Sequence, residues 1–208
     1  MNSPSDNSAR QRLLSAAEEI FAAKGFNRAS VREICQAAGV NGAAINYYFG
    51  DKASLYREVL KPAAALTEIP QEMLAEDVDL RAGIEAYYRP LLAMARDPHM
   101  PLRYMLFMRE QIQPSGLIGG ECQDFFRPRF EQLRAFLIRH CGSQTAANAV
   151  NQLALSLIGM GMILFLKPDI VRAYAPDLMN SDAALEQTLQ RLCDQAVALV
   201  KAQAGCQP

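Results

Sequence analysis

The chain has 208 residues, half of them hydrophobic and 21% charged, with a formal net charge of −1. This size and composition indicate a soluble globular protein of one large or two small domains. The longest nearly continuous apolar run, residues 153–166, is shorter than the roughly 18 residues of a membrane-spanning helix, and the polar first dozen residues argue against a signal peptide. Five cysteines without a CxxC pair argue against a disulfide framework or a zinc site, so we expect a cytoplasmic protein with no metal and no membrane partner.

A first helix is predicted from about Ser8 to Lys24, where apolar residues recur at helical spacing and Gly25 marks the end. Residues 1–61 carry a small excess of basic over acidic side chains, whereas the rest of the chain is acidic. The sign of this asymmetry agrees with an N-terminal module that contacts DNA.

Two short helices joined by a tight turn are predicted after this first helix. Ser30 and Glu33 form a capping box, in which each side chain accepts a hydrogen bond from the other residue's amide. Gly39 suits the left-handed conformation that ends a helix, and Asn41 is a favourable N-cap for a second helix over residues 42–49. Two helices joined in this way form a helix-turn-helix.

The second of these helices has a composition that suits contact with DNA. Its first turn, residues 42–44, is almost without side chains, so the backbone can approach a groove and alanine methyls can touch thymine methyls. Asn46 can pair with an adenine edge, and the hydroxyls of Tyr47 and Tyr48 can reach phosphates. Lys52, in the first turn of the next helix, opposes the helix dipole but suits a backbone that meets a phosphate. The alternative is a structural three-helix bundle with a surface tyrosine pair.

Residues 10–60 resemble the DNA-binding domain of the TetR family of transcriptional repressors. The residues at the family's motif positions are Gly39, Val40, Ile45, Tyr48, Phe49, Lys52 and Leu55. The form INYYFGDKASLY of residues 45–56, and more loosely MLFMREQIQPS of residues 105–115, is similar to the subset with a CecR-like C-terminal domain.

This resemblance implies a role for each matching position. Arg32, on the first helix of the pair, matches a position that contacts bases. The other base-facing positions match Gly42, Ala43, Ala44 and Asn46, and the phosphate-contacting positions match Tyr47, Tyr48 and Lys52.

The remainder of the chain is predicted to be helical, because no alternating strand pattern occurs in it. We predict an all-α protein of about nine helices, with a three-helix helix-turn-helix domain in residues 1–60 and a larger helical domain for effector binding and dimerisation in residues 61–208. The predicted helices of this second part span residues 80–95, 102–111, 125–140, 146–166, 170–174 and 182–202.

The last two long helices are candidates for a dimer interface. Apolar residues on the last helix recur at spacings of four and three, which is typical of a seam between packed helices. By resemblance to TetR-family dimers we expect a homodimer that uses both helices; the alternative is that they complete the core of one protomer. The predicted interface residues are Leu157, Gly161, Leu185, Leu189, Leu192, Ala196 and Leu199.

An aromatic and methionine-rich set on the middle helices is a candidate effector site. Such sets often form a core, but regulators of this family usually bury an effector cavity in this region. Arg109 could orient an anionic group, or it could form a salt bridge with Glu110 or Glu121. We expect a small, mainly apolar or aromatic effector. The predicted lining is Tyr87, Tyr104, Met105, Met108, Arg109 and Phe126.

The sequence gives no indication of catalysis. The two histidines, His99 and His140, belong to no catalytic order, and no phosphate loop or metal-ligand spacing occurs, so we expect no catalytic residue, metal or cofactor. The helix-turn-helix and the resemblance to the TetR family together imply a repressor that binds a palindromic operator in double-stranded DNA as a dimer, associates with the nucleoid when bound, and is released by a small molecule. The alternative is a ligand-binding or protein-docking module with a vestigial helix-turn-helix.

Overall fold

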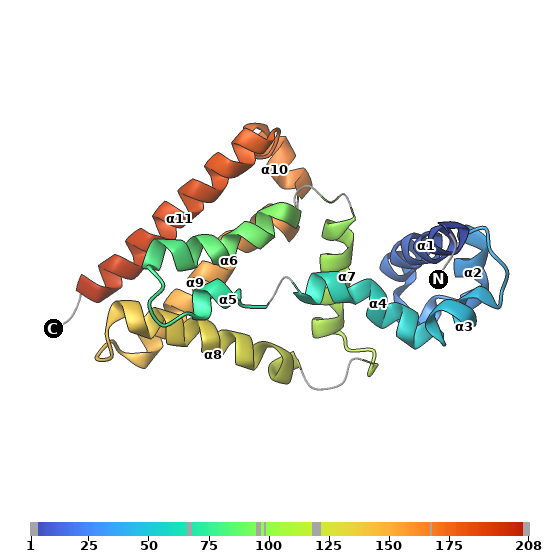
Figure 1. The fold of residues 1–208 in the computed structure, drawn as a ribbon, viewed down its shortest axis with the longest axis horizontal. Helices are drawn as coiled ribbons and strands as arrows, with labels where there is room; N and C mark the ends of the chain where they lie inside the picture. Colours follow the sequence, from blue (N-terminus) through green and yellow to red (C-terminus); the bar gives the residue numbers. More distant parts are fainter. Residues whose placement is uncertain are drawn as a thin grey trace. The chain divides into compact units, whose positions relative to one another are not determined.

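The computed structural model describes residues 4–65, 68–94, 97, 99–117, 122–166 and 168–205. All regular structure in these residues is helical, in eleven α-helices and one 3-10 helix (Figure 1). The predicted all-α class is confirmed. The count is close to the predicted nine because the additional elements are short, such as α5 (Gln71–Leu74) and the 3-10 helix η1 (Pro176–Leu178). None of the described helices is both long enough and apolar enough to span a bilayer.

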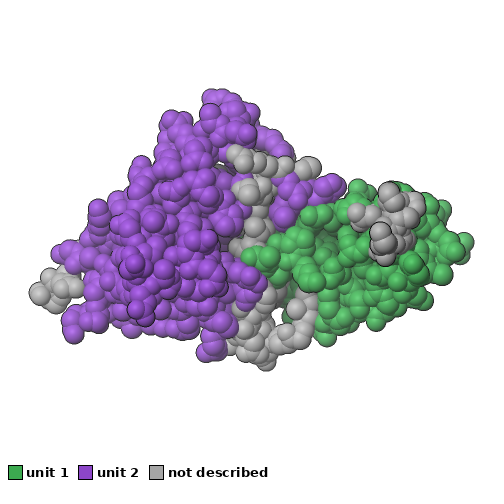
Figure 2. Space-filling model, viewed as in Figure 1, with its two compact units in different colours: residues 1–65, 102–119 green, residues 66–101, 120–208 purple. Residues whose placement is uncertain are grey.

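The chain divides into two compact units (Figure 2). Unit 1 contains residues 1–65 and 102–119, and unit 2 contains residues 66–101 and 120–208. The domain boundary predicted at residue 60 stays a prediction. Unit 1 also includes a segment from beyond residue 100, which the sequence did not indicate.

The first four helices of the chain lie in unit 1. They are α1 (Pro4–Arg28), α2 (Val31–Ala37), α3 (Ala44–Phe49) and α4 (Lys52–Ala65). α1 packs against α2 and α4, and α3 packs against the same two helices. Because α2 and α3 are too short to be stable alone, their positions depend on the apolar side chains that they bury. The fully buried side chains include Leu13, Phe21, Ile34, Ile45 and Leu55.

The first helix is longer at both ends than predicted, since α1 begins at Pro4 and ends at Arg28. Gly25 has a φ of 73°, which breaks the helical geometry at the point where the sequence predicted the helix to end. One further turn follows this kink, and its Phe26 ring lies 5.2 Å from the ring of Tyr56.

The helix α7 (Met100–Ile112) supplies most of the distant segment of unit 1. Leu106, Phe107 and Glu110 are buried on one face of this helix, whereas Met105 and Ile112 are exposed on the opposite face. α7 therefore has an inner face that packs in the unit and an apolar outer face.

Unit 2 is organised around α11 (Asp182–Gly205), which packs against α6 (Leu80–Met94), α8 (Cys122–Cys141) and α9 (Ala147–Leu166). The short helix α10 (Pro168–Tyr174) contacts α9. These helices and α7 begin and end within about three residues of the predicted bounds. The buried apolar residues include Ile84, Tyr88, Leu133, Phe136, Leu137, Leu157, Leu189, Cys193 and Val200.

Two glycines let helices of unit 2 approach closely. A Cβ at Gly83 of α6 would lie 2.4 Å from the ring of Phe136 on α8. A Cβ at Gly161 of α9 would lie 2.9 Å from Leu91 on α6. Real Cβ atoms essentially never make such contacts, and Phe136 is fully buried, so the packing of α6 against α8 depends on the absence of a side chain at Gly83. At Gly161 the neighbouring atom is a terminal methyl of Leu91, which can shift.

Candidate nucleic-acid interface

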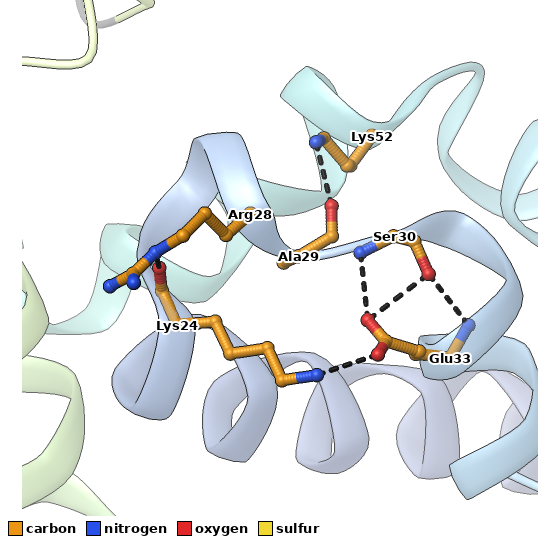
Figure 3. Close-up of polar contacts among 6 residues, drawn as sticks. All are labelled: Lys24, Arg28, Ala29, Ser30, Glu33 and Lys52. Atoms are coloured by element: carbon orange, nitrogen blue, oxygen red, sulfur yellow. Dashed lines mark hydrogen bonds and ion pairs between the residues drawn. The ribbon is translucent and has the colours of Figure 1, made fainter.

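The helix α2 begins at the predicted capping box, which is confirmed. The Ser30 Oγ accepts from the amide of Glu33 at 3.1 Å, and the Glu33 carboxylate accepts from the amide of Ser30 at 3.2 Å. This carboxylate also accepts from Nζ of Lys24 on α1 at 2.6 Å (Figure 3). The bond from Lys24, followed by the bonds from Ser30, lowers the pKa of Glu33. The start of α2 is thus tied to α1, and Arg32 in its first turn is exposed.

The turn after α2 has the backbone geometry that the sequence predicted. Gly39 has a φ of 63°, in the left-handed region that favours glycine. The amide of Val40 donates to the carbonyl of Cys35 at 3.0 Å, as in a Schellman-type helix end. Nothing lies within 4 Å of the position of the absent Cβ, so the backbone and not the available space requires glycine here.

The helix α3 begins two residues later than the sequence predicted. The prediction placed its start at Gly42 with Asn41 as the N-cap, whereas α3 begins at Ala44. The Asn41 Oδ1 accepts from the amide of Ala43 at 2.6 Å, which closes a local turn and delays the helix. The exposed residues Gly42 and Ala43 therefore form a nearly side-chain-free turn directly before α3.

The helix α3 buries one anchor and presents polar residues to solvent. Ile45 is fully buried and holds α3 on the unit, whereas Asn46 is exposed and Tyr47 is 75% exposed. The rings of Tyr47 and Tyr48 meet edge to face with centroids 4.8 Å apart. Packing does not explain a tyrosine that is so exposed, so this surface is a candidate for contact with another molecule.

Unit 1 contains all the residues predicted to contact DNA. Seven lie on α2, the turn and α3, and Lys52 lies at the start of α4. The base and phosphate contacts themselves stay predictions. The exposed members are Arg32, Gly42, Ala43, Asn46 and Tyr47, and the half-buried members are Ala44, Tyr48 and Lys52.

Lys52 has partners inside unit 1. Its Nζ donates to the carbonyls of Phe26 at 3.0 Å and Ala29 at 2.8 Å, and it lies 4.1 Å from the centre of the Phe26 ring. The preceding residue, Asp51, accepts from the amide of Ser54 at 2.6 Å and so caps the start of α4. The sequence showed Lys52 only as a candidate phosphate contact, because its carbonyl partners lie 23 and 26 residues away along the chain.

Polar contacts fasten α7 to α1 and α4. Arg103 forms a salt bridge of 2.6 Å with Glu18 of α1, whose side chain is 2% exposed. Tyr56 of α4 donates to Glu110 at 2.9 Å, and both residues are buried. Burial, followed by the hydrogen bond to Glu110, raises the pKa of Tyr56. These pairs are 85 and 54 residues apart, so no local pattern in the sequence could reveal them.

The residues predicted to line an effector site lie on three helices. Tyr104, Met105, Met108 and Arg109 lie on α7, Tyr87 lies on α6, and Phe126 lies on α8. Met105 is 49% exposed, and the others are half-buried. Among the described residues, the Arg109 guanidinium donates to the carbonyl of Ala22 at 3.5 Å and forms no salt bridge, while Glu121 lies outside them. The effector site stays a prediction. Across all the residues that the structure describes, no cluster of His, Cys, Asp or Glu could hold a metal ion.

Of the seven residues predicted for a dimer interface, all of which belong to unit 2, five are buried within the protomer. Gly161 admits side chains of α6, and Leu192 is half-buried. The outward faces of α9 and α11 still carry large apolar side chains, with Leu155 61% and Leu199 43% exposed. These two helices complete the protomer's core, and their contact with a partner stays a prediction. The buried members of the predicted set are Leu157, Gly161, Leu185, Leu189 and Ala196.

Two family models match this sequence. The model described as bacterial regulatory proteins of the tetR family matches residues 13–59. The model of the C-terminal domain of the HTH-type transcriptional dual regulator CecR matches residues 80–204, which is more than half of the chain. The first match covers α2, the turn and α3, where the predicted DNA contacts lie.

Curated relatives are regulators of the same kind. RutR of Escherichia coli K12 is 31% identical over 112 residues, which are 54% of this chain and 52% of that protein. SrpR of Pseudomonas putida is 28% identical over 136 residues, which are 65% of this chain and 62% of that protein. The chain thus matches about half the length of the first of these relatives and less than two thirds of the second.

Solved structures share the fold over nearly the whole chain. HlyIIR, a hemolysin II transcriptional regulator, matches with a TM-score of 0.58 and 21% identity, covering 91% of this chain and 97% of that one. A putative transcriptional regulator of Pseudomonas aeruginosa PAO1 matches with a TM-score of 0.61 and 18% identity, covering 95% and 90%. At these identities the structures show the fold, while the CecR model, which matches more than half of the chain, shows the family. The chain belongs to the TetR family of bacterial regulatory proteins.

Proposed function

We propose that this regulator is a repressor that binds a nearly palindromic operator as a homodimer and leaves it when a small apolar or aromatic effector binds. The observation that supports this most is the surface of α2, the turn and α3. It combines an exposed arginine, a turn of small residues and a 75% exposed tyrosine, Tyr47, on helices held by buried anchors. Two further relatives carry the name repressor: KstR2 of Rhodococcus jostii and BepR of Brucella suis.

The exposed set suits the major groove of DNA. Arg32 would pair with a guanine edge and Asn46 with an adenine edge, and the small residues Gly42 and Ala43 would let the backbone approach. Tyr47 and Tyr48 would fix the register through phosphates. One domain of this kind presents a single short recognition helix, so specific binding calls for two half-sites and a symmetric dimer.

The dimer part of the proposal rests on the outward faces of α9 and α11. Leu155 and Leu199 are large apolar side chains that the protomer leaves 61% and 43% exposed. Burying them against a second copy would remove this apolar surface from water, which favours association.

Leu199→Glu tests this interface, because Leu199 is exposed and the change spares the protomer's core. We expect sedimentation to show monomers and operator binding to be lost. Ile170→Glu is the matched control, since Ile170 is 45% exposed on α10, outside both proposed faces. An intact dimer in Leu199→Glu would show that the interface lies elsewhere.

The effector part rests on α7. Its outer face exposes Met105 and Ile112, and methionine adapts to varied apolar shapes. Its inner face is bonded to α1 and α4 through Arg103 and Glu110. A ligand that displaces α7 would therefore act directly on the helices that hold the helix-turn-helix, with a coupling of about 1–3 kcal/mol.

Met105→Trp tests the effector site in titrations of candidate ligands against the preformed protein–DNA complex. Because Met105 is exposed, the larger ring should leave folding and operator binding intact while it blocks the ligand. Ile170→Trp serves as the control. If Met105→Trp responds to the effector as the wild type does, the ligand binds at another place.

The central experiment recovers genomic fragments with the pure protein and sequences them, followed by mobility shifts with the enriched duplex. We expect an enriched near-palindrome, and we expect Tyr47→Ala combined with Asn46→Ala to abolish its recovery. A folded wild-type protein that enriches no sequence would favour a ligand-binding module with a vestigial helix-turn-helix.

A further inference from the structure

The helix α2 is held at both ends by cationic side chains from other helices of unit 1. α2 has only seven residues, so its orientation is set by its contacts and not by its own stability. It carries the exposed Arg32 in its first turn. Whatever fixes the ends of α2 therefore fixes the position from which Arg32 reaches a base.

The first cation is Lys52, at the N-terminal side of α2. Its Nζ donates to the carbonyl of Phe26 at 3.0 Å. It also donates to the carbonyl of Ala29 at 2.8 Å (Figure 3), and Ala29 directly precedes the N-cap of α2. An ammonium has three N–H donors, and two of them are used here. The ammonium also lies 4.1 Å from the centre of the Phe26 ring, a cation–π contact that adds to its hold on this segment.

The second cation is Arg12, at the C-terminal side of α2. Its Nε donates to the carbonyl of Ala38 at 3.0 Å, and Ala38 is the C-cap residue of the helix. The last carbonyls of a helix have no partner within the helix, and a positive charge there also favours the helix dipole. Nη1 of Arg12 donates to the Ser8 hydroxyl at 3.0 Å, which keeps the guanidinium in place on α1.

We propose that Lys52 and Arg12 are positioning residues for the reading of DNA sequence. They clamp α2 between α1 and α4, so that Arg32 meets base edges at a fixed angle. Two N–H donors of each cation bond to oxygens of the protein, and these bonds, instead of a phosphate contact, define the role of the two residues. This inference rests on the proposed function, because it assigns a role in operator recognition.

A cation that contacts a phosphate and a cation that positions α2 should differ in two measurements, the salt dependence of binding and the preference for the correct sequence. A cation that neutralises a phosphate contributes about 0.9 to the slope of log K against log salt concentration, and its loss weakens all sequences alike. A cation that positions α2 contributes little to that slope. Its loss instead lowers the preference for the correct sequence, because a misplaced arginine no longer pairs with its base.

The experiment compares Lys52→Met and Arg12→Gln with the control Arg28→Gln. Arg28 lies close to the start of α2 but is exposed and donates to the carbonyl of Lys24 in its own helix at 3.1 Å (Figure 3). The probes are the duplex that the wild-type protein enriches from a randomised pool and a scrambled duplex of the same length. Affinity for each probe is measured over a range of salt concentrations, and thermal unfolding is measured in parallel.

We expect both positioning variants to lose discrimination between the two duplexes by on the order of tenfold or more. We expect their salt slope on the scrambled duplex to match that of Arg28→Gln. Lys52→Arg should recover part of the discrimination, since a guanidinium can also donate to two carbonyls. A salt slope lowered by about 0.9 per contact with unchanged discrimination would overturn the inference in favour of a phosphate contact. Unchanged discrimination with only a lower melting temperature would overturn it in favour of a structural role.

A measurement without DNA separates a failure of this inference from a failure of the proposed function. Amide exchange over residues 29–39 should be faster in Lys52→Met and Arg12→Gln than in Arg28→Gln, because α2 loses an anchor only in the first two. Equal exchange in the three variants would overturn the clamp whichever duplexes are bound. If the wild type enriches no duplex, the proposed function fails, and the exchange rates still decide whether the two cations hold α2.

Discussion

Replacing Tyr56 by phenylalanine should loosen the attachment of α7 to α4. The Tyr56 hydroxyl donates to Oε2 of Glu110 at 2.9 Å, whereas the amide and hydroxyl of Ser115 both donate to Oε1 at 2.7 Å. Glu110 is only 4% exposed, so water replaces the lost donor poorly. A hydrogen bond to a charged group contributes about 1.5–3 kcal/mol, and the retained bonds at Oε1 place the expected loss at the lower end.

Hydrogen exchange by mass spectrometry measures this loss directly in the native protein. A change of about 1.4 kcal/mol is a factor of ten, so amides of α7 should exchange about 10 to 30 times faster in Tyr56→Phe. Tyr104→Phe is the matched control, because the Tyr104 hydroxyl has no hydrogen-bond partner among the described residues. If the two variants exchange alike, the buried bond does not hold α7 and the coupling proposed through it loses its basis.

Three further predictions concern single sites. Gly83→Ala should destabilise the protein by about 1–3 kcal/mol, because its Cβ would meet the Phe136 ring at 2.4 Å; Gly159→Ala, with nothing within 4 Å, should be neutral or stabilising in the same denaturant titrations. Arg32→Ala should cost on the order of 1–3 kcal/mol of operator affinity and relax the preference at one base pair per half-site in a binding-site selection. Burial raises the pKa of the Cys193 thiol from 9.0 to about 11. The protonated thiol should therefore stabilise the fold fully below pH 9, and this stabilisation should be lost between pH 9 and 11. Cys193→Ala should flatten the plot of unfolding free energy against pH in that range.

Local sequence patterns predicted the helix-turn-helix well because its determinants are a few residues apart. Ser30 and Glu33 satisfy each other's amides within one turn, and Gly39 needs only a permissive backbone. The start of α3 was predicted wrongly for an equally local reason. Asn41 can cap a helix or close a turn with the amide two residues on, and the sequence alone does not rank these two hydrogen bonds.

The contacts between distant segments could not be predicted. Glu18 and Arg103 are 85 residues apart, and no local sequence pattern around either residue predicts a buried salt bridge. The same holds for the carbonyl partners of Lys52. A lysine near a helix-turn-helix suggests a phosphate contact, because its side chain is positively charged. Only the fold shows that the ammonium of Lys52 already donates to two carbonyls of the protein.

The apolar spacing on α11 predicted a packing face correctly, but it did not identify the helices on the other side of that face. Leu185, Leu189 and Ala196 are buried within the protomer. A heptad-like seam looks the same in sequence whether it faces a neighbouring helix of the same chain or a second copy. For this reason the exposed Leu199 is the more informative position for the dimer.

The attachment of α7 also has a consequence for the engineering of hybrid regulators. A chimera that joins residues 1–65 to the sensor domain of another protein would leave Glu18 buried without Arg103 and Tyr56 without Glu110. Removing one partner of a buried ion pair costs about 3–5 kcal/mol, a large part of the stability of a small domain. The compact N-terminal unit of this chain is therefore discontinuous, and a stable graft has to carry α7 together with α1 to α4.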